Sequence, residues 1–208
     1  MTGAELVLAL SGVLALLGLV AWERGGGGGK EVALVATLAA TAAAGRVLFA
    51  AIPSSQPVTT ICICTGIALG GRAGAAVGAT TALISNAFLG QGPWTPWQML
   101  SWGVVGASAG WLRPLLTRRG PLLAFGAAWG MLFGAIMDVY QIAAFGPAFT
   151  VQAFVATHVR GIPFDVSHAV TNVILLGVVG PALIRLLHRY AARLRTEIVY
   201  DAPTEVAP

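Results

Sequence analysis

Charge is scarce in this chain. Of its 208 residues only 10% are Asp, Glu, Lys or Arg, whereas 57% are hydrophobic, and the mean hydropathy is +0.81. Soluble domains carry about 25% charged residues, so the composition excludes a water-soluble globular domain as the main body. Several apolar runs approach the roughly 17–25 residues that a transmembrane helix needs. The sequence therefore predicts a single integral membrane domain.

Motifs for catalysis and energy conversion are also lacking. There is no GxxxxGK[ST] phosphate loop, so the chain is not expected to hydrolyse ATP itself. There is no HExxH and no histidine cluster for a catalytic metal. The two cysteines, Cys62 and Cys64, would point to nearly opposite faces of a helix, which indicates small apolar fillers rather than a disulfide or a metal clamp. We therefore expect neither an enzyme nor a bound metal or cofactor.

Seven apolar stretches predict transmembrane helices. The third and the fifth are short, which indicates partial unwinding or burial in protein at their ends. The first lacks a basic N-terminal region, so we interpret it as a helix rather than a signal peptide. The predicted spans are residues 4–22, 31–51, 58–70, 73–89, 99–112, 122–145 and 167–187.

A run of five glycines divides the chain near its start. It predicts a flexible linker over residues 25–30, which separates an N-terminal transmembrane helix (1–24) from the rest. Residues 31–190 form the predicted six-helix substrate-binding membrane domain. The polar, proline-containing end (191–208) is predicted to be a disordered cytoplasmic tail.

Basic residues fall on one side of the membrane if these spans alternate in direction. Only Arg160 lies on the opposite side, and Arg46 lies inside a span. Because Lys and Arg collect in cytoplasmic loops, we predict a multi-pass plasma membrane protein with its N-terminus outside and its C-terminus in the cytoplasm. The ten residues on the predicted cytoplasmic side are Arg24, Lys30, Arg72, Arg113, Arg118, Arg119, Arg185, Arg189, Arg193 and Arg195.

The uncharged segment 90–98, GQGPWTPWQ, is predicted to lie on the outer side. Its two prolines and two glycines disfavour a regular helix. Trp94 and Trp97 favour the boundary between lipid and water, and Gln91 and Gln98 offer donors and acceptors beside them. The segment is therefore interpreted as a lid or binding surface.

Two further connections reach the same predicted side. Residues 52–57 are short and contain prolines, and residues 146–166 are longer. The apolar middle of the longer connection, 148–155, is expected to lie along the membrane surface.

The polar residues within the predicted spans all fall in the halves that are predicted to lie near the outer side of the membrane. Such residues are costly in a membrane and tend to face a cavity or a partner, so their shared position in the outer halves predicts an outward-facing polar pocket. Arg46 and Asp138 are expected to pair with each other, which would lower the desolvation cost of both. The set comprises Arg46, Asn86, Asp138, Gln141, His168 and Asn172.

Small residues recur at four-residue spacing. Ala36 and Ala40, with Ala39 and Ala43 beside them, form a stripe on the second span. Such stripes let helices approach closely in a membrane. The stripe fits two interpretations equally well: packing inside the bundle, or docking of another membrane subunit.

The region from the second span onward resembles the substrate-binding S components of energy-coupling factor (ECF) transporters. The likeness covers about residues 31–190 and is most specific over 46–103. Within that family the chain is most similar to the group assigned to cobalamin and related cobamides. The residues that carry the resemblance are GRVLFAAIP at 45–53, QPVT at 56–59, GIALG at 66–70, Ser85-Asn86, and the segment 90–98.

This resemblance implies an all-α bundle of six transmembrane helices, here with one additional N-terminal helix. It implies a vitamin bound at the extracytoplasmic end, a transmembrane coupling protein of the EcfT kind, and two cytoplasmic ATPase subunits. The A-x-x-x-A docking motif of the family maps onto Ala36 and Ala40. The predicted substrate-binding residues are Arg46, Gln56, Asn86, Gln91, Trp94, Trp97, Gln98, Asp138 and Asn172.

The expected function is vitamin uptake, with cobalamin or a related cobamide as the expected ligand. Two alternatives remain from the sequence. One is a stand-alone permease or facilitator that needs no ATPase. The other is a membrane scaffold or enzyme without a small-molecule pocket.

Overall fold

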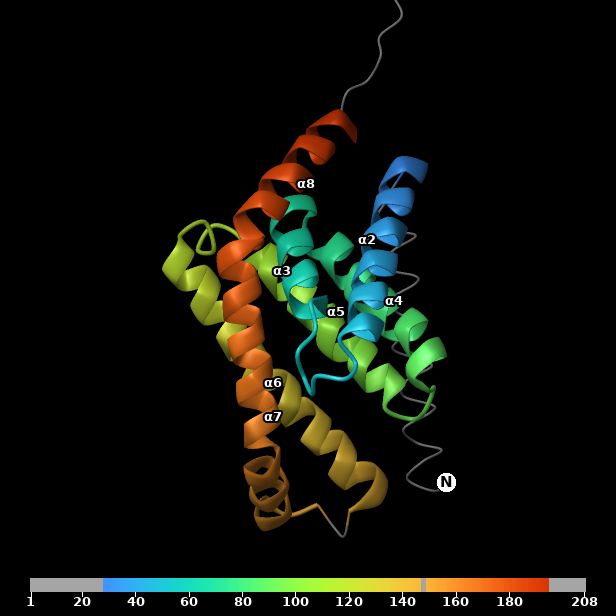
Figure 1. Ribbon diagram of the computed structural model, residues 1–208, viewed down its shortest axis with the longest axis vertical. Helices are drawn as coiled ribbons and strands as arrows, with labels where there is room; N and C mark the ends of the chain where they lie inside the picture. The colour runs from blue at the N-terminus through green and yellow to red at the C-terminus, as the bar shows by residue number, and fades with distance from the viewer. Residues whose placement is uncertain (1–27, 147–148, 195–208) are drawn as a thin grey trace, which may run out of the picture.

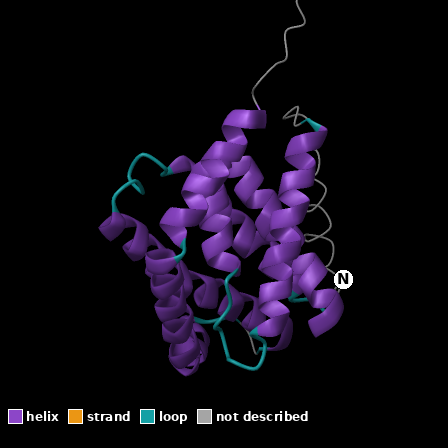
Figure 2. Cartoon of the chain, turned by 45° about the horizontal axis from the view of Figure 1, so that its top comes forward, coloured by secondary structure: helices purple, strands orange, loops and turns teal. Residues whose placement is uncertain are grey.

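Every regular element in the computed structural model is an α-helix within the residues that it describes, 28–146 and 149–194 (Figures 1 and 2). The predicted N-terminal helix and nearly all of the predicted tail lie outside these ranges. The helices are α2 (Gly29–Leu48), α3 (Val58–Leu69), α4 (Gly71–Leu89), α5 (Thr95–Trp111), α6 (Arg119–Phe145), α7 (Val151–Val178) and α8 (Gly180–Leu194).

Three of the described helices, α2, α6 and α7, are long and apolar enough to cross a membrane. Helix α3 is apolar but short, with 12 residues, as predicted. Helices α4 and α5 pack closely through small residues, because a Cβ atom on Gly106 of α5 would overlap the backbone of Gly74 on α4. The prediction of an all-α integral membrane bundle is confirmed.

Helix α3 lies at the centre of the bundle. Its residues from Val58 to Ala68 are all buried, and helices α2, α4, α5 and α8 surround it. This environment explains why α3 carries no charged residue on any side. Cys62 and Cys64 are both free and buried, in agreement with their interpretation as apolar fillers.

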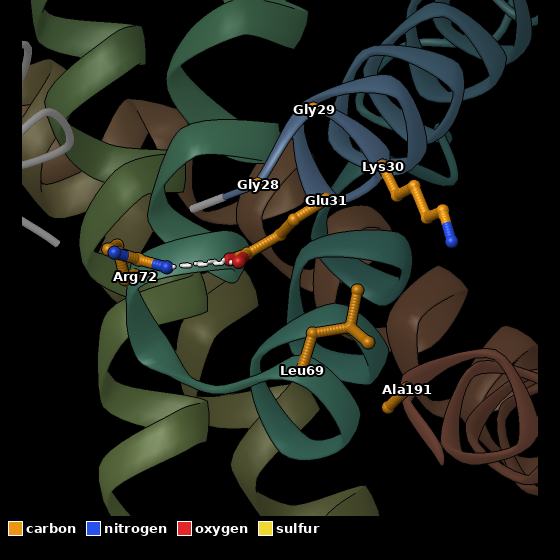
Figure 3. A pocket seen from close by; sticks show the side chains of 7 residues that line it. All are labelled: Gly28, Gly29, Lys30, Glu31, Leu69, Arg72 and Ala191. Carbon is orange, nitrogen blue, oxygen red and sulfur yellow. Dashed lines mark hydrogen bonds and ion pairs between the residues drawn. The ribbon is translucent and has the colours of Figure 1, made fainter. Parts of the chain in front are cut away.

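The bundle has two distinct ends. The start of α2 and the end of α8 lie at the top of Figure 1, whereas the connections after α2 and α4 lie lower in the view. At the upper end, Arg72 forms an ion pair with Glu31 at 2.9 Å. Figure 3 shows this pair beside a hollow of about 520 Å³ that also reaches Leu69 and Ala191. Lys30 also lines this hollow, so at least two of the basic residues assigned to the cytoplasmic side, Lys30 and Arg72, lie at this end.

The prediction of a non-helical segment over residues 90–98 was wrong for its second half. Helix α5 begins at Thr95, and Pro96 lies in its first turn. Proline is tolerated there because its missing N–H would have no partner within the helix anyway. Trp97 and Gln98 are therefore residues of a helix, while residues 90–94 form the connection.

The prediction of a connection over residues 146–166 was also wrong. Helix α7 begins at Val151, and the Thr150 hydroxyl caps it by accepting a hydrogen bond from the Ala153 N–H at 3.1 Å. Pro163 lies inside this helix, which membrane helices tolerate when neighbouring groups satisfy the freed backbone. Most of the segment that we expected to lie along the membrane surface is therefore part of a transmembrane helix.

The predicted last span, 167–187, is divided between two helices. Helix α7 ends at Val178 and α8 begins at Gly180, with Pro181 in its first turn. Because proline cannot continue the preceding hydrogen-bond ladder, it favours a new helix start at this position.

Candidate functional site

Arg46 is the centre of a buried hydrogen-bond network at the lower end of the bundle. It lies in the last turn of α2 and is only 8% exposed. Its Nε donates to Gln56 Oε1 at 2.9 Å, and Nη1 donates to Ser85 Oγ and Asn86 Oδ1, each at 2.6 Å. Nη2 donates to Gln98 Oε1 at 3.3 Å. One guanidinium thus joins α2, the following connection, α4 and α5.

An indole ring forms one side of this network. The guanidinium carbon of Arg46 lies 4.9 Å from the ring centre of Trp102, a cation–π contact. Trp102 Nε1 donates to Thr59 Oγ1 at 3.1 Å, and that hydroxyl lies 2.8 Å from His168 Nε2. Polar contacts therefore continue from α2 through α5 and α3 to α7.

The guanidinium group of Arg46 donates its hydrogen bonds to oxygens of uncharged side chains. In the described ranges it forms no ion pair with a carboxylate. The predicted pair between Arg46 and Asp138 is wrong, because Asp138 bonds instead to His158 on α7. Amide and hydroxyl dipoles stabilise the guanidinium without cancelling its charge, so the site keeps a net positive charge.

The arginine also fixes the orientation of the surrounding amides. A guanidinium can only donate hydrogen bonds, so the oxygens of Gln56, Asn86 and Gln98 must face it. The Asn86 Nδ2 group donates to Thr95 Oγ1 at 2.9 Å and to Gln98 Oε1 at 2.8 Å. The NH₂ groups of Gln56 and Gln98 have no hydrogen-bond partner among the described residues. Two amide donors therefore remain available at this site.

The connection between α4 and α5 is tied to the helix before it. The Thr95 hydroxyl donates to Gln91 Oε1 at 2.9 Å, and Gln91 Nε2 donates to the Leu83 carbonyl at 2.8 Å. The six-membered ring of Trp94 lies against Gly92. Gln91 and Trp94, both predicted to bind substrate, thus belong to a defined loop beside the arginine network.

Two other predicted site residues form contacts between helices that do not include Arg46. The ring of Trp97 lies 6.1 Å from that of Tyr140 on α6. Asn172 is fully buried and donates from Nδ2 to the Gly126 carbonyl at 3.0 Å. Neither side chain forms a hydrogen bond with the arginine network.

Asp138 belongs to a second polar cluster between α6 and α7. Its Oδ2 lies 2.8 Å from His158 Nδ1, and Asp165 Oδ2 lies 3.7 Å from the same nitrogen. His158 and Asp165 were missed in the sequence because residues 146–166 were interpreted as a connection. Their seven-residue spacing corresponds to one face of a helix and would have indicated the cluster.

Sequence reasoning also missed Ser85, Thr59 and Trp102 as contributors to the arginine network. Trp102 follows Gln98 by four residues, so the two share one face of α5. Ser85 precedes Asn86 directly, and both side chains contact Arg46. The position of Thr59 depends on the packing of α3 against α5 and α7, for which the sequence carries no signal.

The alanine stripe on α2 is divided between two faces. Ala39 and Ala43 are buried, at 0% and 3% exposure, on the helix that packs against α4. Ala36 and Ala40 are exposed within the described part of the chain. Packing is therefore assigned to Ala39 and Ala43, whereas docking of another subunit stays a prediction for Ala36 and Ala40.

Residues 29–189 match the sequence model of a family described as the S component of ECF-type riboflavin transporters. The chain belongs to this family. No curated protein and no solved structure matches the chain. Membership confirms the resemblance to ECF S components, which are subunits of membrane transporters and not enzymes. The family description names riboflavin, so the expectation of a cobamide receives no support from it.

Proposed function

We propose that this ECF S component captures a vitamin at the Arg46 end of the bundle and delivers it inward together with a coupling protein and two ATPase subunits. The observation that carries the proposal is the buried arginine, which holds three amide side chains from three segments in fixed orientations. Preorganised polar groups with aromatic neighbours are typical of small-molecule sites.

The available groups define the chemistry of the ligand. Arg46 supplies positive charge, and Gln56 and Gln98 supply uncommitted N–H donors. Trp94 supplies a flat aromatic face on the connection that Thr95 joins to Asn86 and Gln91. These groups suit a ligand with carbonyl oxygens on a flat ring. The isoalloxazine ring of riboflavin carries two such carbonyls, and the family description points to the same vitamin.

Cobalamin, the ligand expected from the sequence, places different demands on the site. Its corrin ring is much wider than a flavin and would require the connections 49–57 and 90–94 to part further. Arg46 and Trp102 are 8% and 1% exposed, so the network is closely packed. This packing favours the flatter vitamin.

The proposal is tested by titrating the purified full-length protein in detergent with riboflavin and, separately, with cobalamin. We expect saturable riboflavin binding that weakens in Gln56→Leu and Gln98→Leu. Gln152→Leu, at an exposed position of α7, is the matched control and should bind as the natural protein does. Saturable binding of cobalamin alone would overturn the flavin assignment, and binding of neither vitamin would contradict the site.

We further propose that Ala36 and Ala40 contact the coupling protein. Their exposure on a long transmembrane helix supports this role, since small residues let another helix approach closely. Uptake of riboflavin into vesicles that contain this chain alone would instead indicate a stand-alone permease.

The Arg46 end is proposed to face outward, with the C-terminus in the cytoplasm. The opposite end carries Arg72 and the start of α2, and Arg185, Arg189 and Arg193 lie along α8. Basic residues favour the cytoplasmic side. The proposal of an outside N-terminus depends on the predicted helix 4–22, which lies outside the described residues.

A further inference from the structure

A compact group of three metal-ligating side chains lies between α6 and α7, which pack along each other. Asp138 comes from α6, and His158 and Asp165 come from α7. Each offers one ligand atom, and these atoms all lie within 4.8 Å of one another. His158 Nδ1 is 2.8 Å from Asp138 Oδ2 and 3.7 Å from Asp165 Oδ2.

The carboxylate of Asp165 is buried and incompletely bonded. Asp165 is 6% exposed, and its Oδ2, which faces His158, has no hydrogen-bond partner. No Lys or Arg of the described segments forms an ion pair with Asp138 or Asp165. Two carboxylates in membrane-spanning helices are costly unless a cation compensates them, and one imidazole carries at most a single positive charge.

The surrounding helix faces leave room for these side chains and orient them. A Cβ atom on Gly134 would overlap the Asp165 carboxylate, so the lack of a side chain at this position leaves the space that the carboxylate occupies. A Cβ on Gly161 would lie 3.6–3.8 Å from the carboxylate oxygens of Asp138 and Asp165. The Phe154 ring stacks on His158 with a centroid distance of 5.8 Å and an interplanar angle of 6°, which holds the imidazole plane.

We propose that Asp138, His158 and Asp165 bind a divalent transition-metal ion of the zinc type between α6 and α7. Imidazole nitrogen and carboxylate oxygen are common zinc ligands, and three protein ligands leave a further position open. Mg²⁺ and Ca²⁺ prefer all-oxygen sites with more ligands. Two carboxylates and a neutral imidazole carry two negative charges, which a divalent ion balances.

The ligand separations suit such an ion. Bonds of about 2.0–2.2 Å place the ligand atoms of a tetrahedral site roughly 3.3–3.6 Å apart. The observed spacing, from 2.8 Å to at most 4.8 Å, requires side-chain shifts of only about 1 Å. The side chains of His158 and Asp138 are 28% and 14% exposed, so the cluster is not sealed inside the protein. A bound ion would join α6 to α7.

The test uses the full-length protein in detergent after removal of metals with a chelator. We expect one Co²⁺ per chain, with visible absorption bands of a low-coordinate site that Zn²⁺ abolishes by displacement. Zn²⁺ affinity, measured by calorimetry, should fall at least about tenfold in the near-isosteric Asp165→Asn and in His158→Gln. His188→Gln, which alters an exposed histidine on α8, is the matched control and should bind Zn²⁺ normally.

The natural protein alone can overturn the inference. Absence of the cobalt bands and of a stoichiometric zinc signal would do so, and so would binding of Mg²⁺ in preference to Zn²⁺. Equal zinc affinity in the natural protein and both variants would assign the metal to surface groups. If thermal unfolding shows that a variant is not folded, the cobalt spectrum of the natural protein alone tests whether the metal site exists. This result does not depend on which vitamin the arginine site binds.

Discussion

The arginine network of α2 to α5 and the Asp138–His158–Asp165 cluster of α6 and α7 place charge inside a membrane protein in opposite ways. Arg46 donates to four side-chain oxygens, all from neutral residues. Asp165 leaves a carboxylate oxygen without any hydrogen bond. In the first region the guanidinium is fully engaged by side-chain oxygens, and the NH₂ groups of Gln56 and Gln98 have no partner among the described residues. In the second region, three ligand atoms lie within 4.8 Å of one another.

This difference indicates two kinds of site. A buried charge whose hydrogen-bond partners are neutral still attracts polar groups of a ligand, and it holds the neighbouring amide side chains in one orientation. Both properties suit selective binding of an uncharged ring. A pair of carboxylates around one imidazole lowers its cost by binding a cation. Substitutions in the first region should therefore change vitamin affinity, and substitutions in the second should change metal affinity.

The largest effect is expected at the centre of the first region. Arg46→Met removes the common donor and leaves the oxygens of Asn86, Gln56 and Gln98 to rearrange. Riboflavin affinity, measured by titration in detergent, should fall at least about 100-fold, which corresponds to about 2.7 kcal/mol. Arg46→Lys should retain part of the affinity, because an ammonium keeps the charge but not the planar fork.

The matched control for this experiment is Arg113→Gln, at an exposed position in the connection before α6. It should bind riboflavin as the natural protein does. Equal riboflavin affinities for Arg46→Met and Arg113→Gln would show that the arginine network does not bind the vitamin. The proposed functional difference between the two regions would then be wrong.

A somewhat smaller effect is expected on the two faces of α2, the helix that carries Arg46. Ala40→Leu alters an exposed position and should leave unfolding nearly unchanged, but it should weaken assembly with the coupling protein at least about tenfold, because the side chain prevents close helix approach. Ala39→Leu fills a buried position and should destabilise the fold by about 1–3 kcal/mol. Co-purification and thermal unfolding measure the two outcomes. Normal assembly of Ala40→Leu and Ala36→Leu would place the docking face elsewhere.

Removal of an aromatic face should have a moderate effect. Trp94→Ala deletes the ring of the connection between α4 and α5 and should weaken riboflavin binding about tenfold, within the roughly 1–3 kcal/mol known for stacking of flat rings. The same titration measures it. Trp111→Ala, at a strongly exposed position at the end of α5, is the control. Unchanged affinity in Trp94→Ala would exclude the loop from the site.

The smallest loss of riboflavin affinity is expected when Thr95, which joins the connection 90–94 to the arginine network, is substituted. Thr95→Val keeps the side-chain shape but removes the hydroxyl that joins Asn86 to Gln91. Because Asn86 still donates to Gln98, riboflavin affinity should fall only about threefold, in line with the net value of one hydrogen bond. A loss as large as that of Arg46→Met would show that loop and network are not separable.

Much of the arginine network could be predicted from the sequence. Arg46, Gln56, Asn86 and Gln98 all lie at the ends of apolar stretches or in the short connections that join them, so helix alternation brings them to one end of the bundle. The partner of Arg46 could not be predicted in the same way. Opposite charge favoured Asp138, but the packing of α6 against α7 places that carboxylate beside His158.

The first part of α7 could not be predicted because of its amino-acid composition. Gly161 and Pro163 are helix breakers in water, and they made residues 146–166 look like a connection. In this helix Gly161 lies near the carboxylates, and Pro163 is accommodated within α7. The cluster of Asp138, His158 and Asp165 was therefore missed, because the spacing of His158 and Asp165 carries meaning only once residues 151–178 are recognised as a helix.

The central claim is that the vitamin binds against the arginine network from outside the cell. It is tested most directly by labelling Gln56→Cys on intact cells with a membrane-impermeant maleimide, with and without riboflavin, since the natural cysteines are buried. We predict labelling without permeabilisation and a rate at least about tenfold slower with saturating riboflavin. Thr117→Cys, at an exposed position in the connection between α5 and α6 that is predicted to be cytoplasmic, should react only after permeabilisation. Labelling of Gln56→Cys only in permeabilised cells, or at a rate that riboflavin leaves unchanged, would contradict the account.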